Sequence, residues 1–138
     1  MMVETDVLYA YVKRKDWLKP VADRLLRRVA EGEFGTVYAS RESLHEMYYV
    51  SLEEGVPLDE IISRFALLTS IDNLIFLETT YEIDLLALTL MKQFKLASIF
   101  DAYYAATALN QVPDHTIITT DTAYDRIPGV RRVDPREL

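Results

Sequence analysis

The 138-residue chain has no cysteine, only two histidines and only four glycines. Without cysteine it can form no disulfide, no thiolate metal site and no thiol nucleophile. With only His45 and His115, a zinc site built from histidine is also disfavoured. The N-terminus lacks a basic segment followed by an apolar stretch, so no signal peptide is predicted. These absences together predict an intracellular, cytoplasmic protein.

The sequence also lacks long apolar runs, internal repeats and low-complexity tracts. No run approaches the ~20 apolar residues of a membrane span, so no membrane partner is expected. No G-x-G-x-x-G motif is present, which disfavours a dinucleotide-dependent enzyme. Because no linker divides the chain and its length suffices for one core, we predict a single domain over residues 1–138.

Basic residues are fewer than acidic ones, and the formal net charge is −7. This balance argues against a general nucleic-acid coat protein, which would be basic. The imbalance is concentrated in residues 35–114, which carry twelve acidic and four basic side chains. Basic groups nearer the N-terminus, such as Lys13, Arg14 and Lys15, could contact phosphates locally, although a solvated helix face is the simpler interpretation.

Short apolar segments alternate with segments of helical periodicity. Those with strand character are Met1–Val3, Thr36–Ala39, Leu74–Leu77, Thr116–Thr119 and Val130–Val133. Those with helical character are Val7–Val12, Trp17–Ala30, Arg41–Leu52, Leu58–Leu68, Tyr81–Phe94 and Ile99–Leu109, with a short helical turn at Asp121–Arg126. This order predicts an α/β fold with helices around a mostly parallel sheet of four to five strands.

Four acidic residues stand inside or next to these apolar segments: Glu4, Glu46, Asp101 and Asp121. Carboxylates are costly to bury singly, so such acids need partners. Glu4 and Asp121 each follow a predicted strand, and ligands of parallel sheets bind beyond the carboxyl ends of the strands. If the fold gathers the four acids, their natural partner is a hard divalent cation. A cation held this way, with open positions, can hydrolyse phosphodiesters.

Some of these acids also have structural interpretations at helix ends. Asp121 could cap the short turn that follows it. Asp6 suits the N-cap of a helix from Val7 onward, although a cap at a strand tip can also face a metal. Glu4 and Glu46 could simply be exposed.

Asp101 is the sharpest case, because it interrupts an apolar, alanine-rich helix. Aspartate weakens a helix interior slightly and strains a core unless it is paired. It could be an N-cap or half of a buried ion pair, but no basic residue lies between Lys95 and Arg126. A functional role is therefore favoured.

Four motifs together resemble the PIN-domain nuclease family. The first is Val3-Glu4-Thr5-Asp6-Val7-Leu8, where the family has an apolar strand, then Asp-Thr-Asn or Asp-Thr-Ser, then Val-Leu. The second is the six-residue step from Ser40 to Glu46. The third is Asp101-Ala102-Tyr103-Tyr104-Ala105-Ala106-Thr107-Ala108. The fourth is Thr120-Asp121-Thr122-Ala123-Tyr124, followed by Ile127-Pro128-Gly129. The motifs cover essentially the whole chain in the family's order, with Glu4 departing from the usual Asp.

The resemblance implies a three-layer α/β/α sandwich and an endoribonuclease that hydrolyses RNA phosphodiester bonds with Mg²⁺ or Mn²⁺. Glu4, Asp101 and Asp121 would hold the metal. Glu46 would be a further ligand or would orient the attacking water, and Asp6 would add a possible fifth carboxylate. Hydrogen bonds to these ligands would come from Thr5, Ser40 and Thr120.

The resemblance also implies a toxin of the VapC type within a VapBC-type toxin–antitoxin pair. Its partners would be an RNA substrate, a small antitoxin protein and a second copy in a homodimer. Tyrosines that could stack on bases or line an interface are Tyr9, Tyr11, Tyr48, Tyr49, Tyr103 and Tyr104.

Two other functions compete with this hypothesis. A non-catalytic PIN-like module that binds RNA or protein stays open, because glutamate at position 4 is one methylene longer than aspartate and could shift a metal. A phospho-acceptor signalling domain would need a lysine at the end of its last strand. The chain has Arg131 and Arg132 there and no lysine after Lys95, which disfavours that alternative.

Overall fold

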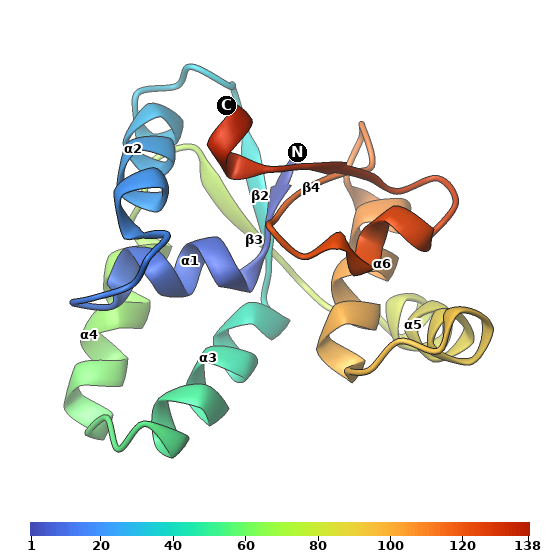
Figure 1. The fold of residues 1–138 in the computed structure, drawn as a ribbon, viewed down its shortest axis with the longest axis horizontal. Coiled ribbons are helices and arrows are strands. Elements are labelled where there is room, and N and C mark those ends of the chain that lie inside the picture. Colours follow the sequence, from blue (N-terminus) through green and yellow to red (C-terminus); the bar gives the residue numbers. More distant parts are fainter.

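The computed structural model describes all of residues 1–138 as a twisted parallel sheet between two groups of helices (Figure 1). The five strands are β1 (Met2–Val3), β2 (Val37–Ser40), β3 (Leu74–Leu77), β4 (Thr116–Ile118) and β5 (Arg131–Val133). The six α-helices are α1 (Thr5–Val12), α2 (Lys19–Ala30), α3 (Glu42–Glu53), α4 (Leu58–Thr69), α5 (Tyr81–Phe94) and α6 (Ile99–Gln111). Two short 3₁₀ helices complete the chain, η1 (Thr122–Arg126) and η2 (Pro135–Glu137). No helix has the length and apolar character needed to span a membrane.

The sheet has the order β3-β2-β1-β4-β5, and every neighbouring pair of strands is parallel. The predicted three-layer α/β/α sandwich with four to five strands is therefore confirmed. The chain builds outward from β1 to β2 and β3, and then returns to place β4 on the other side of β1. Between β1 and β4 the order reverses, and a crevice opens beyond the strand ends at such a point in α/β sheets.

Two apolar cores lie on opposite faces of the sheet, because successive strand residues point to opposite sides. Val3 and Ile118 belong to the core that is covered by α1, α2 and α4, together with Met47 of α3. Met2 and Ile117 belong to the core covered by α5 and α6. Figure 1 shows α5 and α6 on one side of the sheet and α1, α2 and α4 on the other.

The prediction of a helix from Trp17 was wrong by two residues. The side chain of Trp17 is 69% exposed, and α2 begins at Lys19 with Pro20 in its first turn. Proline is favoured there because the first N–H groups of a helix have no internal partner. Trp17 therefore lies outside the helix, and its exposed side chain contributes nothing to the core.

Candidate active site

Five carboxylates line one cavity of about 310 Å³ near the carboxyl ends of β1 and β4: Glu4, Asp6, Glu46, Asp101 and Asp121. Glu4 follows β1, Asp6 lies in the first turn of α1, and Asp121 follows β4. Glu46 comes from α3 and Asp101 from the first turn of α6. The cavity is therefore assembled from segments that span almost the whole chain.

Glu4, rather than Asp6, caps α1. One carboxylate oxygen of Glu4 accepts a hydrogen bond from the Thr5 N–H at 2.7 Å, and its side chain is almost fully buried. Asp6 lies two residues after the cap, in the first turn of α1, where its Oδ1 accepts from the Val7 N–H at 2.8 Å. The prediction that Asp6 is the N-cap was wrong because the longer glutamate reaches the helix start from the strand tip.

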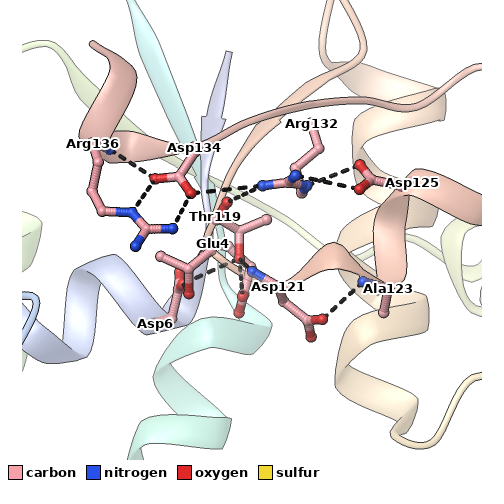
Figure 2. Close-up of polar contacts among 10 residues, drawn as sticks. Glu4, Asp6, Thr119, Asp121, Ala123, Asp125, Arg132, Asp134 and Arg136 are labelled. Atoms are coloured by element: carbon pink, nitrogen blue, oxygen red, sulfur yellow. Dashed lines mark hydrogen bonds and ion pairs between the residues drawn. The ribbon is translucent and has the colours of Figure 1, made fainter.

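Thr119 joins these two acids, as Figure 2 shows. Its hydroxyl lies 3.0 Å from Glu4 Oε2 and 3.2 Å from Asp6 Oδ2, and it accepts the Asp121 N–H at 3.0 Å. A hydroxyl has one proton to donate, so the two carboxylates share it. Thr120 adds two hydrogen bonds to Asp6 Oδ2, from its N–H and from its hydroxyl, each at 2.8 Å.

Arg132 of β5 holds the segment after β4 in place through hydrogen bonds. Arg132 donates to the Thr119 carbonyl at 3.3 Å and to Asp125 of η1 at 2.9 Å (Figure 2). Asp121 itself caps η1, since its Oδ1 accepts the Ala123 N–H at 2.9 Å. One oxygen of Asp121 is thereby fixed, as the capping prediction had it, while the residue still lines the cavity.

Hydroxyl groups from α1, α3 and α6 form a chain of hydrogen bonds that ends at Glu46. The buried Tyr104 hydroxyl donates to Glu46 Oε1 at 3.3 Å and lies 2.7 Å from the Thr5 hydroxyl. Thr5 in turn lies 3.0 Å from the Ser43 hydroxyl. The Thr5 hydroxyl therefore supports Tyr104, which holds Glu46, while the Thr5 N–H bonds to the Glu4 carboxylate.

Asp101 occupies the third position of α6, after the N-cap Ser98, whose hydroxyl accepts the Phe100 N–H at 3.1 Å. A carboxylate in a first helical turn is stabilised by the helix dipole. Asp101 thus lies in the first turn of the helix and does not interrupt its interior, contrary to the sequence interpretation. Burial raises the pKa of Asp101, and the nearby Tyr124 opposes this shift, although the buried Tyr124 hydroxyl makes no hydrogen bond of ordinary geometry.

The acids of the cavity repel one another. Burial raises the pKa of Glu4 well above its ordinary value, and repulsion from Asp6 and Glu46 raises it further. Burial also raises the pKa of Glu46, with added repulsion from Asp101 and Asp6. The pKa of Asp101 is raised by burial and then by Asp121. The pKa values of Glu4, Glu46 and Asp101 are therefore each raised by at least one other acid of the cavity.

The family is decided by a sequence match that covers nearly the whole chain: residues 1–130 match the PIN domain. The chain belongs to the PIN domain family. No curated protein matches the sequence significantly.

Solved structures with the same fold share little sequence with this PIN domain. A toxin–antitoxin complex from Klebsiella pneumoniae is 20% identical, with a TM-score of 0.64 over 97% of this chain and 96% of the other. VapC20 of Mycobacterium tuberculosis, described as a sarcin–ricin loop cleaving toxin, is 16% identical, with a TM-score of 0.71 over 88% and 89%. VapBC2 of Rickettsia felis, bound to a DNA fragment from its promoter, is 15% identical, with a TM-score of 0.71 over 96% and 98%.

The donor chemistry of this PIN domain fits a hard divalent cation. None of the five cavity carboxylates takes part in a salt bridge, although other acids across the surface do. Oxygen ligands with uncompensated charge suit Mg²⁺ or Mn²⁺, and the unpaired Tyr124 hydroxyl adds a buried polar atom beside them. As they stand, however, no three His, Asp or Glu side chains are grouped closely enough to hold an ion.

The structure brings together all five acids predicted for the site, but it separates Ser40 from them. Ser40 is buried, and its hydroxyl accepts the Glu42 N–H at 3.1 Å, which starts α3 rather than orienting a ligand. Sequence reasoning missed Thr119 and the roles of Tyr104 and Tyr124. A threonine directly after an apolar strand and a tyrosine three residues beyond Asp101 were the available signals.

Proposed function

We propose that this PIN domain is a Mg²⁺- or Mn²⁺-dependent endoribonuclease. The observation that carries the proposal is the cavity of five carboxylates, which has no cationic side chain to balance it. A divalent cation would relieve the repulsion, and the phosphate of a nucleic acid would be drawn to the cation. Without a cation, phosphates and carboxylates would repel each other.

Glu4, Asp101 and Asp121 are the residues that would hold the cation, because all three line the cavity. The bound cation would activate water and neutralise charge on the scissile phosphate. Asp6 also lines the cavity, but it accepts four hydrogen bonds, against two at Glu4, so its main role would be to hold the site together. Glu46 has a raised pKa and a fixed position beside Tyr104, which suits a group that orients the attacking water and accepts its proton.

A toxin of the VapBC type, acting in the cytoplasm and held by a small antitoxin, is the biological setting we propose. The names of the similar structures support it, since they include a toxin–antitoxin complex and VapC and VapBC proteins. We also propose a homodimer. An exposed apolar stripe on α5, formed by Tyr81, Leu85 and Leu88, offers a surface for a second copy, and light scattering of the purified protein measures this directly.

The test is cleavage of a mixed panel of labelled RNAs, in Mn²⁺ or in EDTA, by the wild type and by Asp101→Asn. We expect cutting in Mn²⁺ by the wild type alone, with Asp84→Asn on α5 as a matched control that stays active. Cutting in EDTA, or by Asp101→Asn at the wild-type rate, would contradict the assignment. No cutting together with no Mn²⁺ binding would favour a non-catalytic PIN-like module that binds RNA or protein.

A further inference from the structure

Three aromatic rings lie together where α3 meets α6. Tyr48 and Tyr49 of α3 make an edge-to-face contact, with ring centroids 5.4 Å apart and planes at 63°. Tyr49 also contacts Phe100 of α6, with centroids 6.4 Å apart. Tyr49 is nevertheless 58% exposed, so a large part of its ring faces solvent. Contacts with two rings hold Tyr49 in place without burying it.

Two of these rings come from the same helical segments as two acids of the cavity. Tyr49 lies three residues after Glu46, which is about one helical turn, and Phe100 directly precedes Asp101. Glu46 and Asp101 both line the cavity, and they are close enough for Asp101 to raise the pKa of Glu46. The rings do not line the cavity itself, but they come from the same parts of α3 and α6 as two of its acids, so we infer that they lie beside its opening.

The charges around the cavity decide how an RNA can be held there. No lysine or arginine lines it. Arg41, directly before α3, pairs with Glu78 at 2.8 Å. Lys13 and Arg64 lie over the ring of Tyr9, which lines the cavity, but they pair with Glu54 and Glu60. Few protein cations, which supply most non-specific affinity for nucleic acids, are therefore free to bind RNA at this site. Apart from the bound divalent cation, affinity close to the scissile phosphate would come from contacts with the bases.

We propose that Tyr49 and Phe100 form a stacking platform for an unpaired nucleobase next to the phosphate that is cut. Base-on-aromatic stacking tolerates any sequence and needs a base that is free of its duplex. The platform would thus select unpaired RNA and set the nucleotide beside the cleavage point. This inference rests on the proposed nuclease function, and it assigns to two residues outside the acidic cavity a role in positioning the substrate.

The test measures binding of a short fluorescein-labelled, phosphorothioate-linked single-stranded RNA by anisotropy in Mn²⁺. We expect Tyr49→Ala and Phe100→Ala to bind ~10-fold more weakly, the loss typical of one stacking contact. Tyr49→Phe keeps the ring and should bind like the wild type. Trp17→Ala removes a 69% exposed aromatic side chain just before α2 and serves as the matched control. Between ~50 and ~200 mM salt the wild type should lose less than about threefold, because few phosphates are neutralised by the protein.

Wild-type affinity in Tyr49→Ala, or equal affinity for the RNA and its duplex, would overturn the platform. So would weaker binding by Tyr49→Ala that accompanies a loss of dimer in light scattering, because the rings would then be a self-association surface. These results differ from failure of the proposed function, in which the wild type neither cuts nor binds any RNA in Mn²⁺. Cutting by the wild type that is unchanged in both alanine variants contradicts the platform alone.

Discussion

At the scale of single residues, the cavity depends on hydroxyl groups that hold acids near one another. The Thr119 hydroxyl lies within hydrogen-bonding distance of Glu4 and Asp6 and also accepts the Asp121 N–H. Groups of this kind orient metal ligands, and their loss typically reduces metal affinity or activity by about 10–100-fold. Thr119 was absent from the sequence prediction because only the packing of β4 against β1 brings it to Glu4.

Thr119→Val tests this role with a side chain of the same shape. We expect ~10–100-fold weaker Mn²⁺-dependent activity in a protein that stays folded, because both acids lose a donor and the Asp121 N–H loses its acceptor. Thr119→Ser keeps the hydroxyl and should retain most activity. Measurement of cleavage rates against Mn²⁺ concentration separates weaker metal binding from a slower reaction. Equal activity in Thr119→Val and the wild type would show that the hydroxyl is dispensable.

Glu46 makes the stability of the metal-free protein depend on pH. Its pKa is raised by burial and by Asp101 and Asp6, so the metal-free folded protein holds this proton more tightly than the unfolded chain does. Glu46 therefore has little effect on stability below its ordinary pKa, and it destabilises the metal-free protein as pH rises through the raised value. The proposed role of Glu46 in catalysis therefore lowers the stability of the metal-free protein.

Glu46→Gln should accordingly stabilise the metal-free protein at pH ~7.5, by about 0.5–2 kcal/mol, or ~2–6 °C in Tm. The difference should vanish near pH ~4, where both states of the wild type are protonated. Thermal unfolding in EDTA at the two pH values measures it, and the exposed Glu53→Gln on the same helix is the control. A gain that is the same at both pH values would contradict the electrostatic explanation.

At the scale of elements, the helix that carries Asp101 shows what local sequence can and cannot predict. Its alanine-rich pattern predicts α6 correctly, and the Ser98 cap begins it. An acid at the third helical position often bonds back to the cap residue. Asp101 makes no such bond and lines the cavity instead. The Ser98 cap therefore stabilises the start of α6 and, with it, the position of Asp101.

Ser98→Ala should therefore lower the free energy of unfolding. We expect a loss of about 1 kcal/mol, because the Phe100 N–H loses its acceptor. For a chain of this size that corresponds to ~3–5 °C in Tm. Ser98→Thr preserves the hydroxyl and should stay close to the wild type in thermal unfolding followed by circular dichroism. An unchanged Tm in Ser98→Ala would mean that packing of α6 against α5, not the cap, fixes this end.

At the scale of the whole molecule, periodicity and order along the chain predicted the α/β class, the strands and the acids. They could not predict the order of strands in the sheet. Glu4 and Asp121 meet because β4 returns to pair with β1, Val3 being in register with Ile118. Helix starts were wrong by two residues in two places: α2 begins at Lys19 instead of Trp17, and α1 begins at Thr5 instead of Val7. Ser40 was misplaced because its hydroxyl had a nearer partner in the start of α3.

Binding of a divalent cation by the carboxylates of this cavity is the property on which the proposed function depends. It can be measured by calorimetric titration of the purified protein with Mn²⁺ near pH ~7.5, well above the ordinary pKa of the acids. We expect measurable binding by the wild type, ~10–100-fold weaker binding by Asp101→Asn, and unchanged binding by Asp84→Asn. Equal Mn²⁺ affinity in the wild type and Asp101→Asn, or no binding by the wild type, would contradict this expectation.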